Sequence, residues 1–265
     1  MLLTSVVIVL REVLEAALMV SILLAMSRRM GLSLRWLSIA IVIGIAGAIA
    51  YANNLETVSG LFDGVGQELV NATLQSGVFL ALLLTVFLVA WQHTRTPAPS
   101  RLLPAMMAVA VAFGVTQEGS EILVFVVGFI QVSDFFSSVA VGAVAGACIG
   151  FSIGILFYYV LLALGDTHAF RVSLCLLGLV AASMCLQVMQ SLIQADVVSA
   201  QGSVWDTSNL ISEDSLLGQL LYALIGYEAS PTAFEVLAYA GSLVLVAIAV
   251  LLGNSLRVRE ERTST

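Results

Sequence analysis

Two apolar stretches decide the fold: residues 4–26, TSVVIVLREVLEAALMVSILLAM, and residues 108–129, AVAVAFGVTQEGSEILVFVVGF. Each is long enough to cross a membrane as a helix, which takes about 20 mostly apolar residues. The glutamates near their middles are Glu12 with Glu15 and Glu118 with Glu121. An acidic side chain at the centre of a spanning helix costs roughly 2.5–3.5 kcal/mol. Four such side chains therefore require a functional explanation.

The spacing within each pair suggests that explanation. Residues at i and i+3 lie on the same face of a helix, so each E-x-x-E motif presents two carboxylates side by side. Hard cations prefer such oxygen ligands. We therefore interpret Glu12, Glu15, Glu118 and Glu121 as the metal-binding residues of a cation transporter. Arg11 lies four residues before Glu15, within ion-pairing reach on a helix.

The composition places the chain among multi-pass membrane proteins. Its 265 residues are 60% hydrophobic and only 10% charged, and the mean hydropathy is +1.06. A soluble domain carries about 25% charged residues. We expect an all-α membrane protein with seven transmembrane helices in a single domain, residues 1–265. The predicted spans are 4–27, 32–53, 69–91, 103–130, 137–161, 170–193 and 234–252.

The basic residues predict the orientation. All ten are arginines, and only Arg11 lies inside a predicted span. The other nine fall on one side of the seven-span arrangement: Arg28, Arg29, Arg35, Arg95, Arg101, Arg171, Arg257, Arg259 and Arg262. The positive-inside rule places that side in the cytoplasm. We therefore expect a multi-pass protein of the cytoplasmic (inner) cell membrane with its N-terminus outside and its C-terminus in the cytoplasm.

The two motifs also suggest an internal repeat. They lie in the first and fourth predicted spans, which cross the membrane in opposite directions. Spans 1–3 and 4–6 would then form a 3+3 inverted repeat, followed by one C-terminal helix. Transporters with such repeats bind their substrate near the midplane, where the repeats meet.

Three further features predict how the bundle is built. Glycines at four-residue intervals in the fifth span, residues 142–154, predict close helix packing. A polar stripe at the start of the third span, formed by Glu68, Asn71 and Gln75, predicts either interhelical hydrogen bonds or a path for ions. In the long outer loop 194–233, Ser212-Glu213-Asp214 would cap a short helix, Ser215–Ile225, and Gly226 would end it. This loop offers a docking place for an outer partner.

Other classes of protein fit less well. No nucleotide-binding motif is present, and both histidines, His93 and His168, fall in predicted loops. No intramembrane histidine is then left to bind haem or a di-iron centre. We expect no enzyme, no permanently bound cofactor and no nucleic-acid partner. A carrier for protons or organic cations, or a structural membrane subunit with Arg11 clamping the carboxylates, stays open.

The chain resembles the oxidase-dependent iron permeases, the high-affinity iron permeases of fungi and bacteria. The resemblance rests on Arg11-Glu12-Val13-Leu14-Glu15, Glu118-Gly119-Ser120-Glu121, Gly66-Gln67-Glu68-Leu69, Trp205-Asp206-Thr207-Ser208, Ser212-Glu213-Asp214-Ser215 and Gly226-Tyr227 with Pro231. It implies seven spans and iron import, typically of ferric ion, with the motif glutamates as ligands. It also implies an external ferroxidase or metal-binding partner in some members.

The chain departs from the family pattern at two positions. Val13 replaces the usual glycine of the first motif, and Gln117 replaces the arginine of the second. The site is therefore one unit more negative than the family pattern. That charge could change the metal preference, so carriers for manganese, zinc or lead are alternatives to an iron permease. Arg11, Gln117 and Glu68 are the expected supporting residues.

Overall fold

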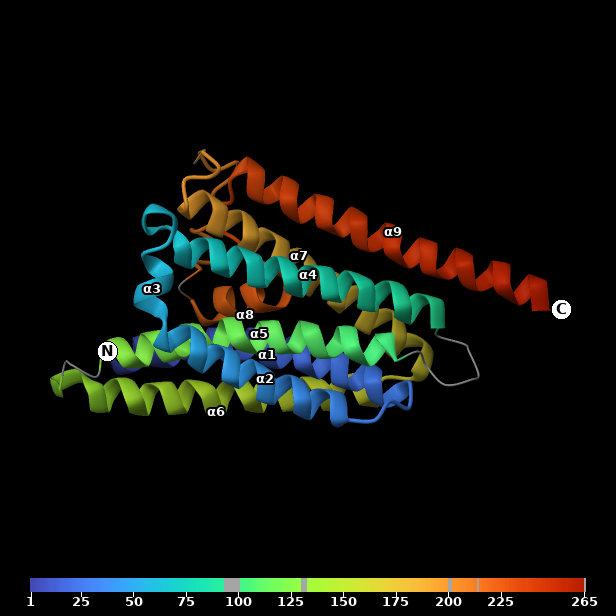
Figure 1. The fold of residues 1–265 in the computed structure, drawn as a ribbon, viewed down its shortest axis with the longest axis horizontal. Helices are drawn as coiled ribbons and strands as arrows, with labels where there is room; N and C mark the ends of the chain where they lie inside the picture. Colours follow the sequence, from blue (N-terminus) through green and yellow to red (C-terminus); the bar gives the residue numbers. More distant parts are fainter. Residues whose placement is uncertain (93–100, 130–132, 200–201, 214, 265) are drawn as a thin grey trace.

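The computed structural model describes residues 1–92, 101–129, 133–199, 202–213 and 215–264. These residues form helices and loops without a β-strand, and they include one isolated bridge between Ser203 and Thr232. The helices are α1 (Leu2–Arg29), α2 (Arg35–Asn53), α3 (Leu55–Ser59), a 3-10 turn (Phe62–Gly64), α4 (Gly66–Gln92), α5 (Leu102–Gly128), α6 (Ser133–Ala163), α7 (Asp166–Gln194), α8 (Leu216–Ile225) and α9 (Ala233–Ser264). The long helices run roughly along one axis (Figure 1).

Six of the described helices are long and apolar enough to cross a membrane: α2, α4, α5, α6, α7 and α9. They confirm the predicted all-α membrane class. The first predicted span corresponds to α1, which has 28 residues but is not among these six. Arg11, Glu12 and Glu15 lower its apolar character near the middle. His93, Arg95 and Asp214, used in the sequence-based predictions, lie outside the described residues.

Several predicted helix boundaries required correction, and α6 begins at Ser133 rather than at residue 137. Helix α7 begins at Asp166 rather than at residue 170, so His168 lies in its first turn and not in a loop. The last helix continues to Ser264 instead of ending at residue 252. Its C-terminal end projects past the other helices (Figure 1). Helix propensity extends these elements beyond their apolar segments, whereas the predictions followed hydropathy alone.

The glycines of α6 bring this helix into close contact with α1. A Cβ atom at Gly146 would lie 2.5 Å from the carbonyl oxygen of Val6. A Cβ atom at Gly150 or Gly154 would lie 2.8 Å from Cγ1 of Val13 or 2.7 Å from Cβ of Ala17. The predicted packing role is confirmed. The glycine stripe fixes the stretch of α1 that carries the first motif.

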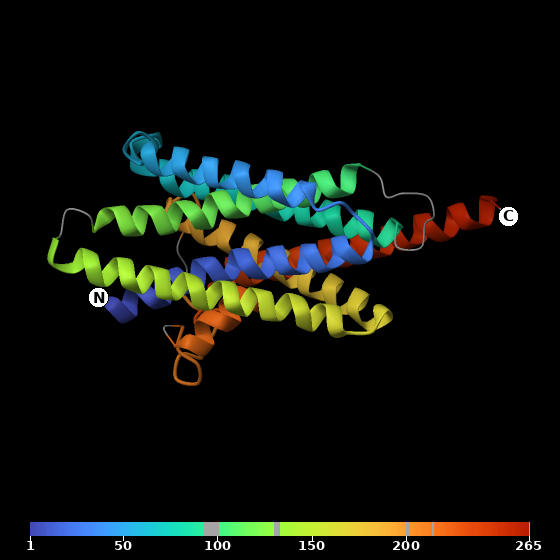
Figure 2. The same ribbon diagram turned by 90° about the horizontal axis from the view of Figure 1, so that it is seen from below.

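The second motif helix, α5, packs most extensively against α2, and α4 packs against α7. Helices α1, α2, α5 and α6 lie on one side of the bundle, while α4, α7 and α9 lie on the other (Figures 1 and 2). Small residues again allow the approach, since a Cβ atom at Gly119 would lie 3.0 Å from Cβ of Ala48. The main apolar core includes Met19, Leu82, Met107 and Leu177 from these helices.

Helix α8 confirms the predicted short helix in the long loop. Its N-cap is Ser215, whose Oγ accepts a hydrogen bond from the Gly218 backbone N–H at 3.0 Å. The cap is therefore one residue past the predicted Ser212-Glu213-Asp214. Gly226 ends the helix, as predicted, and it has the left-handed conformation with φ of 65°. Helix α8 packs against α7 and α1.

Candidate metal site

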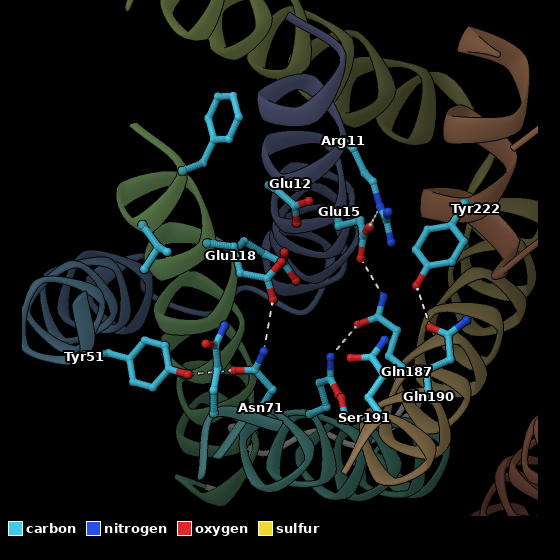
Figure 3. Close-up of a pocket in the computed structure, with 16 residues that line it drawn as sticks. Arg11, Glu12, Glu15, Tyr51, Asn71, Glu118, Gln187, Gln190, Ser191 and Tyr222 are labelled. Carbon is cyan, nitrogen blue, oxygen red and sulfur yellow. Dashed lines mark hydrogen bonds and ion pairs between the residues drawn. The ribbon is translucent and has the colours of Figure 1, made fainter. Parts of the chain in front are cut away.

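Three of the four predicted glutamates meet between α1 and α5. One carboxylate oxygen from each of Glu12, Glu118 and Glu121 lies within 4.8 Å of the other two. Glu12 and Glu118 are buried, with 8% and 5% of their surface exposed, and Glu121 is half-buried. In Figure 3 the carboxylates of Glu12 and Glu118 point toward each other. Three oxygens at this spacing could surround one cation.

The fourth glutamate, Glu15, is not a member of this group. Its Oε1 accepts from Arg11 Nε at 3.2 Å, and its Oε2 accepts from Gln187 Nε2 at 2.6 Å. The ion pair that the sequence predicted between Arg11 and Glu15 is therefore present. The i, i+3 spacing placed Glu15 beside Glu12 on α1, but Glu15 contacts Arg11 of its own helix and Gln187 of α7 instead (Figure 3).

Glu121 is held by donors from two helices. Gln117 Nε2 donates to its Oε1 at 2.9 Å, and Asn71 Nδ2 reaches the same oxygen at 3.4 Å. Tyr51 in turn donates its hydroxyl to Asn71 Oδ1 at 3.1 Å. Gln117 and Glu121 are therefore four residues apart on one helix, as are Arg11 and Glu15, but Gln117 carries no positive charge.

These carboxylates form part of the wall of a polar cavity of about 390 Å³. Its walls come from α1, α2, α4, α5, α7 and α8. The lining residues are Arg11, Glu12, Glu15, Tyr51, Gln67, Asn71, Gln75, Glu118, Glu121, Val124, Phe125, Gln187, Gln190, Ser191, Gln194 and Tyr222. All four motif glutamates therefore line one cavity. Gln117 and Glu68 do not line it, although Gln117 contacts Glu121.

Sequence reasoning missed the polar face of α7. Gln187, Gln190, Ser191 and Gln194 follow one another at i, i+3, i+4 and i+7, and all line the cavity. This is the same periodicity that identified the stripe in α4, where Asn71 and Gln75 do line the cavity. The pattern is therefore present in the sequence, but neutral amides near a helix end indicate a functional site less specifically than buried charges do.

A second cavity of about 350 Å³ lies on the other side of the carboxylates and is almost entirely apolar. It shares Glu12 and Glu118 with the polar cavity. Its other walls include Val20 and Leu24 in the later half of α1 and Ile41 in the early half of α2. Glu12 and Glu118 therefore lie at the boundary between a polar cavity and an apolar one.

A third cavity, of about 320 Å³, adjoins the polar one, and the two share Arg11, Gln190, Gln194 and Tyr222 of α8 in their walls. The guanidinium carbon of Arg11 lies 4.1 Å from the centroid of the Tyr222 ring, a cation–π arrangement. The Tyr222 hydroxyl donates to Gln190 Oε1 at 3.2 Å, and the Gln190 amide donates to Glu228. Burial and the nearby carboxylates of Glu235 and Glu213 raise the pKa of Glu228 to about 7.

Comparison with known proteins decides the family. The sequence model of the iron permease FTR1 family matches residues 2–262. The chain belongs to the iron permease FTR1 family. The resemblance noted from the motifs is confirmed, and the chain is a multi-pass membrane protein of an iron-transporting family, a transporter rather than an enzyme.

Curated relatives that match the chain carry the name ferrous iron permease EfeU. The protein of Yersinia pestis is 23% identical over 247 residues, covering 86% of each chain. The protein of Yersinia pseudotuberculosis serotype I (strain IP32953) is also 23% identical over 247 residues, covering 86% of this chain and 85% of the relative. No solved structure matches the chain.

Proposed function

We propose that this family member imports iron through a site formed by Glu12, Glu118 and Glu121, with Glu15 as a fourth ligand. The observation that carries the proposal is the approach of three carboxylate oxygens to within 4.8 Å at the inner end of a polar cavity. If all four glutamates are ionised, they and Arg11 sum to a charge of about −3. A multivalent cation would neutralise that charge and displace any protons on the carboxylates.

The polar cavity is the outer entrance in this proposal. With the N-terminus outside the cytoplasmic membrane, the cavity occupies the outer half of the bundle, because it is lined by the start of α4 and the end of α7. The apolar cavity then occupies the inner half. An apolar segment resists the passage of a hydrated ion, so this arrangement fits a state open to the outside.

An inverted repeat is part of the same proposal, with the chain acting as one unit over residues 1–265. The first and second halves would be α1, α2 and α4, and α5, α6 and α7, followed by α9. The packing supports it, since the motif helix of each half packs against the second helix of the other half, α1 on α6 and α5 on α2. The third helices, α4 and α7, also pair.

Orientation is testable with reporters at the two ends. An N-terminal tag is expected to be accessible outside the cell and a C-terminal tag only from the cytoplasm, because nine of the ten arginines fall on one predicted side. The measurement is protease or antibody access in intact and permeabilised cells. Both tags on the same side would contradict a seven-span chain, in which α1 crosses the membrane.

The proposed substrate is ferric ion, because the site offers only oxygen ligands with a high negative charge, which a hard trivalent cation prefers. The name of the EfeU relatives favours ferrous ion as a second candidate. Neutral Gln117 in place of the family arginine leaves the site more negative than the family pattern, which is consistent with the more highly charged ion. No permanently bound cofactor is needed for this function.

Uptake by proteoliposomes tests the function and the oxidation state together. Vesicles containing only this protein should accumulate labelled iron, and ferric citrate should be compared with iron kept ferrous by ascorbate. Manganese, zinc and lead ions test the alternative substrates. A need for an added ferroxidase would support the external partner implied by the resemblance. Transport of none of these ions would favour the structural-subunit alternative.

A further inference from the structure

Glu15 differs from the other three glutamates because both of its oxygens already have donors. Arg11 reaches Oε1 and Gln187 reaches Oε2, the latter at only 2.6 Å. In contrast, the two donors to Glu121, Gln117 and Asn71, share one oxygen. Hydrogen bonds from a cation and an amide compensate much of the charge of a carboxylate. Glu15 is therefore the glutamate least available to a cation in this structure.

The Gln187 amide is oriented by a second set of contacts. Its Oε1 accepts from Gln75 Nε2 of α4 at 3.0 Å, and Gln75 Oε1 accepts from Ser191 Oγ at 3.3 Å. Because the oxygen of Gln187 faces Gln75, its NH₂ group faces Glu15. Gln75, Gln187 and Ser191 are all buried, with 6–7% of their surface exposed. A fully connected buried network of this kind holds one geometry.

We propose that Gln187 is a positioning residue that keeps Glu15 out of the three-carboxylate cluster until a cation draws it in. The inference rests on the proposed function of that cluster. Three carboxylates capture the ion, and the hydrogen bond from Gln187 limits how strongly the fourth can add to its coordination. This contact would set the balance between capture and release, which a transporter needs because an ion held too tightly does not leave.

Removing the Gln187 amide is expected to tighten the binding of iron. Gln187→Met keeps the length of the side chain but removes its donor, so Glu15 should join the cluster more readily. We expect the KM for iron uptake and the Kd for Fe²⁺ bound to the purified protein under anaerobic conditions to fall about tenfold, the scale of one hydrogen bond to a charged group. The maximal uptake rate should fall by a similar factor, because release slows.

A double-mutant cycle separates this role from a structural one. In the Glu15→Gln background, Gln187→Met should leave the Kd for Fe²⁺ within about twofold, because Gln187 acts through Glu15. Gln187→Leu is the second variant if Gln187→Met does not reach the membrane. Ser191→Ala, at the far end of the network, should lower the Kd by less than Gln187→Met does.

The two proposals fail separately. An unchanged or raised Kd in Gln187→Met, or an equal effect in the presence and absence of the Glu15 carboxylate, would overturn the positioning role. Loss of Fe²⁺ binding in Glu118→Gln would support the three-carboxylate cluster as the site, whatever the result for Gln187→Met. Full Fe²⁺ binding by Glu118→Gln would overturn the proposed function instead.

Discussion

Glu118→Gln is expected to lower iron uptake by more than about a hundredfold while the protein still reaches the membrane. Loss of an outer partner of a metal ligand costs 10–100-fold, and Glu118 is proposed to bind the ion directly. Glutamine keeps the size and hydrogen bonding of the side chain but removes the charge. Glu118 is also only 5% exposed and borders both the polar and the apolar cavity. The measurement is the initial rate of labelled-iron uptake, normalised to the protein in the membrane.

The other motif glutamates provide the comparison. Glu12→Gln, Glu15→Gln and Glu121→Gln should each also reduce uptake strongly. Glu56→Gln is the matched control, since Glu56 is an exposed glutamate of α3 that lies outside the cavity. It should transport at the wild-type rate. Normal uptake by all four motif variants would contradict the proposed carboxylate site.

Arg11→Ala is the second large effect. Arg11 bonds Glu15 and stacks on the Tyr222 ring, so its loss leaves a buried carboxylate without its charged partner. The Glu15 side chain is only 4% exposed, whereas that of Arg11 is 37% exposed, so the cost falls on the carboxylate, and we expect uptake to fall about a hundredfold. Arg11→Lys should also be impaired because lysine lacks the planar guanidinium.

Gln117 provides the test of this asymmetry. Gln117→Ala should reduce uptake only severalfold, because one neutral hydrogen bond to Glu121 is lost and no charge changes. Gln117→Arg should retain uptake but shift its metal preference or pH dependence, because it restores the positive charge of the family pattern. Equal tolerance of Arg11→Ala and Gln117→Ala, measured by uptake, would show that the arginine has no special role.

Much of the bundle could be predicted from local sequence. Apolar length identified the long helices, and the glycines of α6 predicted a close neighbour. Gly226 marked the end of α8 correctly, since a residue at φ of 65° favours glycine. What local sequence could not give was the identity of the partner helix. Contacts between helices distant in sequence depend on the shapes of whole faces, so the pairing of α6 with α1 appears only in the structure.

The different contacts of the four glutamates also could not be predicted from the sequence. The E-x-x-E spacing treats Glu12 and Glu15 alike, whereas the structure places Glu12 in the cluster and Glu15 against Gln187. Gln187 lies 172 residues further along the chain. No helical spacing could connect the two, and only the packing of α7 and α1 around one cavity brings the amide to the carboxylate.

The most direct test of the account is to locate bound iron in the protein. Crystals or cryo-EM grids of the purified permease loaded with iron should show one strong metal peak, confirmed for crystals by anomalous scattering at the iron edge. The account predicts that this peak lies among the carboxylates of Glu12, Glu118 and Glu121 and disappears in Glu118→Gln. A peak confined to the outer cavity near Glu213, Glu228 and Glu235, with the three-carboxylate cluster empty, would contradict it.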